Sequence, residues 1–481
     1  MGALTPVTIT AILIGYFLML IAVSLLTTKN VKESSFYTGD KSSPWFVVSF
    51  GMIGASLSGV TFLSVPGKVL TQEFSYMQMV FGYVVGYLIV AYVLLPIYYK
   101  YNVVSIYEII GERFGVNARK TSAGFFLLSR VIGASLRLYL VALVLDQCIF
   151  SHYQIPFFVS VLATIVLIWL YTFKGGIKTV VWTDMIQTAF MLGAIILSVI
   201  VLYGLLADQN TGGFFDFVKQ SNYSQVFFWS GELSFSTMFF TGIFITVTMT
   251  GLDQDMMQKN LTIGTLKDAQ KNMLWLSCSL VVINFLILFL GSLLATYSDS
   301  IGLNLSEIKT DLRFSKLAIN YLPLTVGIPF VLGTVAAAYS SADSALTSLT
   351  TSFVKDFLES SNKVVSALAR RVVHVGFSLL LFVGIIVFKE VLEEDVIWSL
   401  FKLAGLTYGP LLGIFILAIF TKIQLDERKT YWVLLLTFVI SALLFLFSDV
   451  LLGIKLGFSI SLISTVLTLV GCFAIARKST Y

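Results

Sequence analysis

The residues best suited to chemistry lie in an apolar stretch from Leu322 to Lys355, with the segment AAAYSSADSALTS (336–348) at its centre. In a helix, residues spaced i, i+3, i+4 and i+7 share one face, and that spacing is occupied by Ala337, Ser340, Ser341 and Ser344. Asp343 stands beside this face. A carboxylate in a membrane-spanning helix costs roughly 2.5–3.5 kcal/mol, so it usually faces a cavity or a partner. Because hydroxyl, carboxylate and carbonyl oxygens suit a hard cation such as sodium, the cluster predicts an ion site. A close helix–helix contact is the alternative.

A second stretch, Ser49–Gly67, places four glycines, four serines, a threonine and a proline in one spanning segment. Free backbone in hydrocarbon is tolerated only where it lines a cavity or is satisfied by protein, so we expect a broken helix beside a substrate or ion site. Helix–helix contact would explain Gly51 and Ala55. It does not explain the hydroxyl residues that follow at once, Ser56, Ser58 and Thr61.

A buried acid on another segment bears on the same site. Asp184 lies six residues beyond Lys178, which marks the cytoplasmic edge, and is therefore about 9 Å into the membrane. Asp343 also lies in the cytoplasmic half, so the two acids could share one cation. Otherwise each could pair with an intramembrane arginine, Arg130 or Arg137.

The composition excludes soluble and disordered classes, because 57% of the 481 residues are hydrophobic and only 12% are charged. We predict one transmembrane domain over 1–481, since no charged block is long enough to form a soluble domain. Three scattered cysteines and two histidines offer no haem or zinc centre, and the buried acids have no nucleophile partner, so we do not expect an enzyme. The net charge of +5 is best explained by cytoplasmic loops and not by nucleic acid.

Apolar runs long enough to cross about 30 Å of hydrocarbon predict about 13 transmembrane helices. They cover 7–27, 46–70, 77–99, 121–149, 154–173, 179–206, 234–257, 272–297, 322–353, 368–388, 396–421, 431–448 and 456–476. Of the 31 lysines and arginines, 21 (Lys259 among them) fall in connections on one side, seven fall on the other and three lie within helices. The positive-inside rule then puts the N-terminus outside and the C-terminus in the cytoplasm of a plasma (inner) membrane.

Six segments, in this order, resemble the sodium:solute symporter family. They are SSFYTGDKSSPWF (34–46), SIYEIIGERF (105–114), KGGIKTVVWTDMIQ (174–187), LDQDMMQKNL (252–261), AAAYSSADSALTS (336–348) and YGPLLGIF (408–415). Each is weak alone, but the combination is specific and spans nearly the whole chain. The resemblance implies an all-α polytopic protein of the LeuT type, with inverted five-helix repeats at 46–206 and 234–421, a leading helix at 7–27 and two trailing helices at 431–476.

The resemblance also implies a first sodium site between the broken helix and the serine helix. Its ligands would be the carbonyls of Gly54, Leu57 and Ala337 and the hydroxyls of Ser340 and Ser341.

Some members of the family have a second sodium site, whose acid matches Asp184 and whose serines match Asp343 and Ser344; in this chain Ser340 would complete the set. The family has a serine where this chain has Asp343. Either the second site carries an extra carboxylate, or Asp343 is protonated or salt-bridged and the site is altered. Our hypothesis is a real second site, with one or two sodium ions in all.

The family's substrate site lies near the membrane midplane, beside the helix breaks. The candidate lining residues here are Ser56, Ser58, Thr61, Phe74, Gln78, Arg137, Phe240 and Thr241, and the resemblance leaves open whether Arg130 or Arg137 is the arginine that binds substrate. Arg137 either anchors a substrate carboxylate or pairs with Asp184 or Asp343. Sialic-acid-transporting members use an arginine of the fourth helix for the carboxylate, so we favour sodium-coupled import of a carboxylate-bearing sugar such as sialic acid. A neutral sugar, an amino acid and a monocarboxylate are the alternatives.

The expected mechanism is alternating access, in which sodium and substrate both favour one outward-open state and then leave together to the cytoplasm. An ion channel is the alternative from another class, but one broken helix in each repeat makes a poor selectivity filter. The expected partners are the small-molecule substrate, sodium and the lipid bilayer, with no nucleic acid. By analogy with the family, the protein is expected to be a monomer.

Overall fold

The computed structural model describes residues 5–28, 35–172, 176–206, 217–218, 221–359, 365–391, 396–452 and 459–477. Most of these residues are helical, which confirms the predicted all-α polytopic class. The longer helices are α1 (Pro6–Thr27), α3 (Trp45–Gln72), α4 (Tyr76–Ile89), α7 (Val116–Leu145), α8 (Phe157–Thr172), α9 (Ile177–Leu205), α11 (Phe235–Thr246), α13 (Leu266–Ser300), α15 (Leu324–Phe353), α16 (Ala367–Val391), α17 (Val396–Phe420), α18 (Glu427–Leu452) and α19 (Ile460–Ala474). The shorter ones are α2 (Ser35–Thr38), α5 (Leu95–Tyr101), α6 (Glu108–Phe114), α12 (Gln254–Asn260) and α14 (Arg313–Asn320).

Ten of the described helices are long and apolar enough to cross a membrane, and the bent pair Phe235–Gly251 and Gln254–Asn260 makes up to eleven. Two more apolar helices, α8 and α19, have only 16 and 15 residues. Every one of the 13 predicted ranges overlaps a described helix, although the number of crossings itself stays a prediction. Residues 173 and 456–458, at the ends of two predicted ranges, lie outside the described residues.

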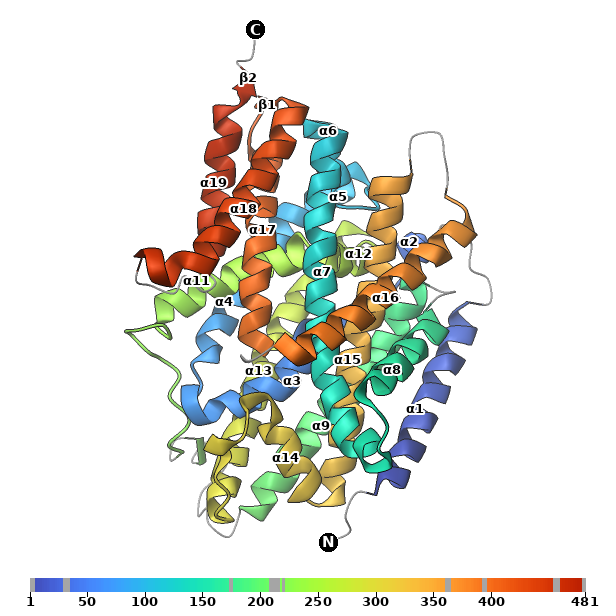
Figure 1. Ribbon diagram of the computed structural model, residues 1–481, viewed down its shortest axis with the longest axis vertical. Coiled ribbons are helices and arrows are strands. Elements are labelled where there is room, and N and C mark those ends of the chain that lie inside the picture. The colour runs from blue at the N-terminus through green and yellow to red at the C-terminus, as the bar shows by residue number, and fades with distance from the viewer. Residues whose placement is uncertain are drawn as a thin grey trace.

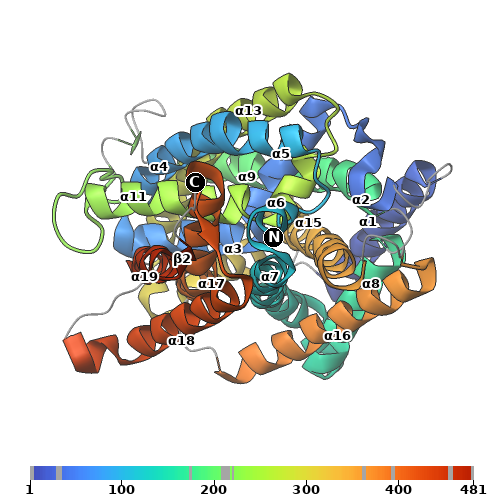
Figure 2. The ribbon, with the colours of Figure 1, turned by 90° about the horizontal axis from the view of Figure 1, so that it is seen from above.

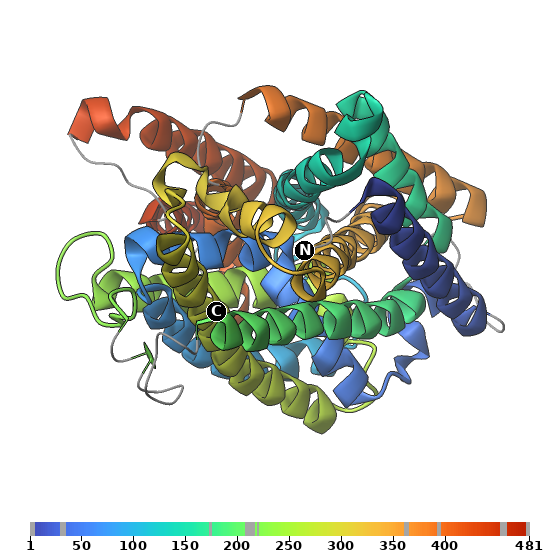
Figure 3. The same cartoon turned by 90° about the horizontal axis from the view of Figure 1, so that it is seen from below.

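The helices divide into an inner and an outer group. In α3, α15 and α17, 83%, 72% and 72% of the apolar window is buried, whereas the figures for α1, α16 and α18 are 33%, 28% and 22%. Seen from above, α16 and α18 lie along one edge and α1 at another, with α3, α7 and α15 between them (Figure 2). The view from below also shows blue α1 at the rim (Figure 3). The apolar outer helices suit contact with lipid, whereas the polar residues of α3 and α15 lie inside the protein.

The predicted break in the second spanning segment is confirmed. Inside α3, Ser58 has φ 51° and ψ 169°, far from helical values, whereas Pro66 lies within the helix. A second interruption lies near Met249, where α11 continues through a π-helical turn at Val247–Gly251 and then bends by 67° into α12. Asp253 caps α12 by accepting hydrogen bonds from the N–H groups of Asp255 and Met256. Two spanning segments are therefore broken inside the protein.

The first turn of α1 and the last turn of α19 lie at opposite ends of the molecule (Figure 1). Near the C-terminal end, β1 (Gln424–Leu425) pairs antiparallel with β2 (Ala476–Arg477), which ties the end of the chain to the connection before α18. This arrangement fits an odd number of crossings. Which end faces the cytoplasm remains a prediction from the lysines and arginines.

Candidate functional site

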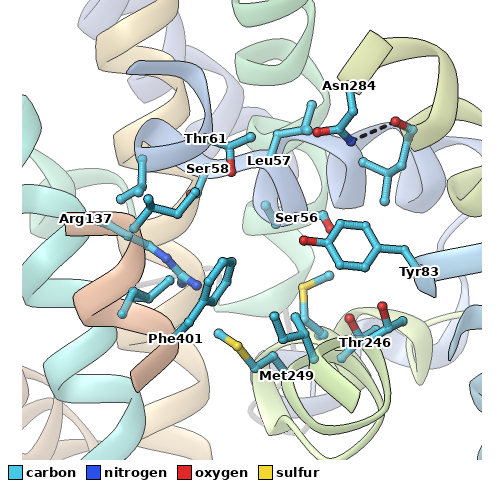
Figure 4. A pocket seen from close by; sticks show the side chains of 18 of the residues that line it. Ser56, Leu57, Ser58, Thr61, Tyr83, Arg137, Thr246, Met249, Asn284 and Phe401 are labelled. Carbon is cyan, nitrogen blue, oxygen red and sulfur yellow. Dashed lines mark hydrogen bonds between the residues drawn. The ribbon is translucent and has the colours of Figure 1, made fainter. Parts of the chain in front are cut away.

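A cavity opens at the break in α3, between α4, α7, α11, α13 and α17. It holds about 720 Å³ of space between atoms, counting its open mouth. Four of the predicted substrate residues line it, namely Ser56, Ser58, Thr61 and Arg137. Figure 4 shows Ser58 and Thr61 on one side, Arg137 and Phe401 on a second, and Thr246 and Met249 on a third.

The break explains why this cavity is polar. Hydrogen bonds from the N–H groups of residues 59–61 to the carbonyls of 55–57 would span Ser58, whose backbone angles do not allow helical geometry. The carbonyl of Leu57 directly precedes this irregular residue. The carbonyl of Gly54 lies just before this set. Irregular backbone at such depth is tolerated where it lines a cavity, as it does here.

Arg130 and Arg137 both line the cavity but differ in their partners. Arg130 forms ion pairs with Asp253, at 3.8 Å, and with Asp255. Arg137 is 7% exposed, and among the described residues its Nε and Nη1 have no hydrogen-bond partner. The structure therefore separates the alternatives for Arg137. Its guanidinium points into the cavity beside Phe401 (Figure 4), and no ion pair joins it to Asp184 or Asp343 in the described part of the chain.

Three tyrosines of α4 line the cavity and were missed from the sequence. The hydroxyl of Tyr87 lies 3.0 Å from that of Ser56, and the hydroxyls of Tyr76 and Tyr83 lie 2.9 Å apart. Their spacing of seven and four residues puts them on one helix face, which was the available signal. Asn284 was also missed. Its Nδ2 donates to the carbonyl of Leu280 at 2.7 Å, and its Oδ1 has no partner among the described residues.

Four predicted substrate residues do not line this cavity. Gln78 instead holds the segment before α11, because its Nε2 donates to the carbonyl of Leu233 at 2.9 Å and its Oε1 accepts from the N–H of Phe228. Phe74 is buried against Phe285. Phe240 is 63% exposed, and together with Thr241 it lines a separate surface pocket beside α19. The later turns of the same segment, at Thr246 and Met249, reach the central cavity instead.

The residues of the predicted first sodium site lie on neighbouring helices. A Cβ added at Gly59 would lie 3.6 Å from the backbone nitrogen of Ala338, so α15 passes close to the break in α3. The Ser341 hydroxyl donates to the carbonyl of Ala337 at 3.2 Å, within the same helix. Gly54 packs against Thr188 of α9, where a Cβ would meet the hydroxyl at 2.2 Å. The two helices are thus close enough to share an ion, and the ligand set itself stays a prediction.

The residues of the predicted second sodium site also come together, and a lysine joins them. Lys259 of α12 forms an ion pair with Asp184 at 2.7 Å, and their side chains are 1% and 0% exposed. The other oxygen of Asp184 accepts from the Ser340 hydroxyl at 2.6 Å. Asp343 accepts from the hydroxyl of Tyr171 at 3.1 Å. The expectation that Lys259 sits in a cytoplasmic connection is wrong, because the bend before α12 carries it inside, and the partner of Asp184 is this lysine and not an arginine.

Comparison with known proteins agrees with this architecture. The profile of the sodium:solute symporter family matches residues 36–432. The sodium/sialic acid symporter NanT of Aliivibrio fischeri is 26% identical over 430 residues, covering 85% of this chain and 82% of NanT. The sodium/sialic acid symporter SiaT of Proteus mirabilis is 24% identical, covering 86% of this chain and 84% of SiaT. The human sodium/iodide cotransporter is 24% identical, covering 80% of this chain and 61% of that protein.

Solved structures show the same fold. A Na⁺-coupled sialic acid symporter in a substrate-bound outward-open state, described as revealing a novel Na⁺ site, superposes with a TM-score of 0.83 at 20% identity over 98% of both chains. A closed form of Mhp1, a nucleobase-cation-symport-1 family transporter, gives a TM-score of 0.55 at 14% identity, covering 92% of this chain and 95% of Mhp1.

Proposed function

The chain belongs to the sodium:solute symporter family, and we propose that it couples sodium entry to the import of a carboxylate-bearing sugar such as sialic acid. Sodium coupling follows from the family. The substrate is our proposal, and it is supported by two relatives that are sodium/sialic acid symporters and are similar over more than 80% of this chain.

The observation that carries the substrate proposal is the state of Arg137. A buried guanidinium with two unpartnered nitrogens, facing a cavity, is well suited to a carboxylate, which it can bind through two parallel hydrogen bonds. Arg130 does not offer the same function, since Asp253 and Asp255 already neutralise it. The hydroxyls of Ser56 and Tyr87, with the amide of Asn284, suit a substrate rich in hydroxyl groups.

Sodium is proposed to bind first, at Gly54, Leu57, Ala337, Ser340 and Ser341. An ion held there would link the break of α3 to α15, so its binding would fix the edge of the substrate cavity. Substrate then binds better to the sodium-bound, outward-open state. Coupling needs this shared preference, since a ligand with equal affinity for both states shifts neither.

The two broken segments support the predicted inverted repeats. The break in α3 and the bend between α11 and α12 each fall in the first helix of a predicted repeat, 46–206 and 234–421. We propose that these repeats rock around the cavity in a multi-pass plasma (inner) membrane protein, with the N-terminus outside and the C-terminus in the cytoplasm. We further propose that one chain is sufficient for transport.

The test begins with thermal unfolding of the purified protein with N-acetylneuraminate, in sodium and in choline. We expect stabilisation only when sodium and the sugar acid are both present. Arg137→Met should weaken the apparent affinity about 10- to 100-fold, because it removes charged hydrogen bonds to the carboxylate. The exposed Arg428→Met is the matched control and should leave the affinity unchanged.

A monocarboxylate is the second candidate, because Arg137 would bind its carboxylate equally well. Lactate and pyruvate therefore belong in the same measurement, beside neutral hexoses, proline and iodide. A sodium-dependent shift with a monocarboxylate and none with N-acetylneuraminate would replace the proposed substrate and keep the role of Arg137. A shift with a neutral hexose alone would contradict that role.

A further inference from the structure

The bend after α11 has a consequence for the ion chemistry of the protein. All seven residues of α12, Gln254–Asn260, are buried. Gln254 and Gln258 fix this short helix, since their side chains donate to the carbonyls of Val104 and Tyr37, each at 2.8 Å. The helix therefore has a defined position, and Lys259 is held inside the protein and not in a solvated loop.

Lys259 and Ser340 together contact both carboxylate oxygens of Asp184. One carboxylate oxygen, Oδ2, lies 2.7 Å from the ammonium, and the other, Oδ1, accepts from the Ser340 hydroxyl at 2.6 Å. Both oxygens thus have a partner from the protein. A sodium ion bound by Asp184 would have to lie next to a positive charge that is 1% exposed and little screened by water.

Asp343 is satisfied in the same way. Its Oδ2 accepts from Tyr171 at 3.1 Å and lies 3.4 Å from the hydroxyl of Thr183, and its Oδ1 accepts from the N–H of Ser344 at 2.6 Å. Hydrogen bonds of this kind stabilise a buried carboxylate without a metal. Among the four residues of the predicted second sodium site, two buried oxygens have no hydrogen-bond partner in the described chain, the Ser344 hydroxyl and Oδ2 of Asp184, and the latter is instead paired with the ammonium of Lys259.

We infer that the ammonium of Lys259 takes the place of the second sodium ion, so that this protein binds and carries one sodium ion at the first site. The residues present do not fit a second, mobile cation, because the Asp184 carboxylate that would bind it is already paired with the ammonium of Lys259. The inference rests on the proposed sodium coupling. It adds that Lys259 sets the number of ions.

The deciding experiment counts bound sodium on the purified full-length protein with radioactive sodium alone, so it needs no organic substrate. The wild type should bind one sodium ion per chain. Lys259→Met removes the charge while keeping a side chain of similar length, and should raise the count to two. Lys259→Arg keeps the charge and should leave the count at one. A wild-type count of two, or an unchanged count of one in Lys259→Met, would overturn the inference.

Lys259→Met leaves Asp184 without its partner and could fail to fold in the absence of sodium. Asp343→Ser provides a second test in which the Lys259–Asp184 pair is intact. If Lys259 is the second cation, this variant binds one sodium ion like the wild type. If Asp343 holds a sodium ion in the wild type, the count falls from two to one, which contradicts the inference. A wild type that binds one sodium ion but imports no N-acetylneuraminate would reject the proposed substrate and leave this inference standing.

Discussion

Arg130 and Arg137 are the same residue type, lie two helical turns apart on α7 and are 5% and 7% exposed, yet among the described residues carboxylates pair with Arg130 and not with Arg137. The difference comes from α12, whose first residues bring Asp253 and Asp255 beside Arg130. Arg137 lies two turns farther along α7, about 10 Å from Arg130 along the axis. One face of α7 therefore carries both Arg130, which is held in ion pairs, and Arg137, which is suited to bind substrate.

The serines of α15 allow a prediction about the first sodium site. Ser341→Ala should weaken the apparent sodium affinity about tenfold or more, since it removes one proposed oxygen ligand. It should change stability little without sodium, because the hydroxyl only returns to the carbonyl of Ala337 within its own helix. Sodium titrations of the unfolding temperature measure both effects. Ser348→Ala is the matched control, as Ser348 is buried in the same helix and makes the same kind of bond, to Ala345 at 3.0 Å. Equal sodium affinity in both variants would contradict the proposed site.

For single residues, the sequence was a good guide to which ones belong to the site and a poorer guide to the partners that each one contacts. The serine face of α15 and the acid at 184 were visible from spacing and burial, and the structure brings them together. Lys259 was counted with the cytoplasmic lysines, because a bend of 67° cannot be measured from residue order. Phe240 and Thr241 were assigned to the substrate site because residue order also does not show which turn of a helix reaches a cavity.

Among the elements, the broken helices were the most predictable from sequence. Glycine, serine and proline within Ser49–Gly67 indicated a break in α3, but the break falls at Ser58 and not at Pro66. The sequence, in contrast, gives only a weak indication that α4 and α11 cross at close range. There Gly82 and Gly242 face each other, and a Cβ at Gly82 would lie 2.1 Å from the carbonyl oxygen of Phe239 and 3.0 Å from Cα of Gly242.

That crossing should be intolerant of a single methyl group. Gly82→Ala should lower stability by about 1–3 kcal/mol, because the atoms it meets are backbone and cannot move aside cheaply. It should also weaken substrate binding, since it separates the tyrosines of α4 from Thr246 and Met249 across the cavity. Thermal unfolding and substrate titration measure the two effects.

Gly193→Ala of α9 is the control for that substitution. A Cβ at Gly193 meets nothing within 4 Å, and alanine favours a helix over glycine by about 1 kcal/mol. The control should therefore be neutral or slightly stabilising. If the two variants unfold alike, the close approach of α4 and α11 does not limit stability.

For the whole molecule, the number of sodium ions decides what drives transport. A sugar acid such as N-acetylneuraminate is a monoanion near pH 7, since carboxyl groups of this kind titrate well below neutrality. One sodium ion with one such anion moves no net charge. Accumulation would then be limited by the sodium concentration gradient alone, with a tenfold sodium gradient supporting about a tenfold substrate gradient.

Uptake of N-acetylneuraminate into proteoliposomes should therefore not respond to membrane potential. Each net charge carried would contribute about 2.3 kcal/mol per 100 mV, or roughly a 40-fold change in accumulation, so the two cases are easy to tell apart. A potassium gradient with valinomycin sets the potential while the sodium gradient is held constant. Lys259→Met, which should carry a second sodium ion, is the matched comparison, and its accumulation should rise when the inside is negative. If wild-type accumulation rises in the same way, more than one sodium ion enters with each anion, and the lysine does not replace one of them.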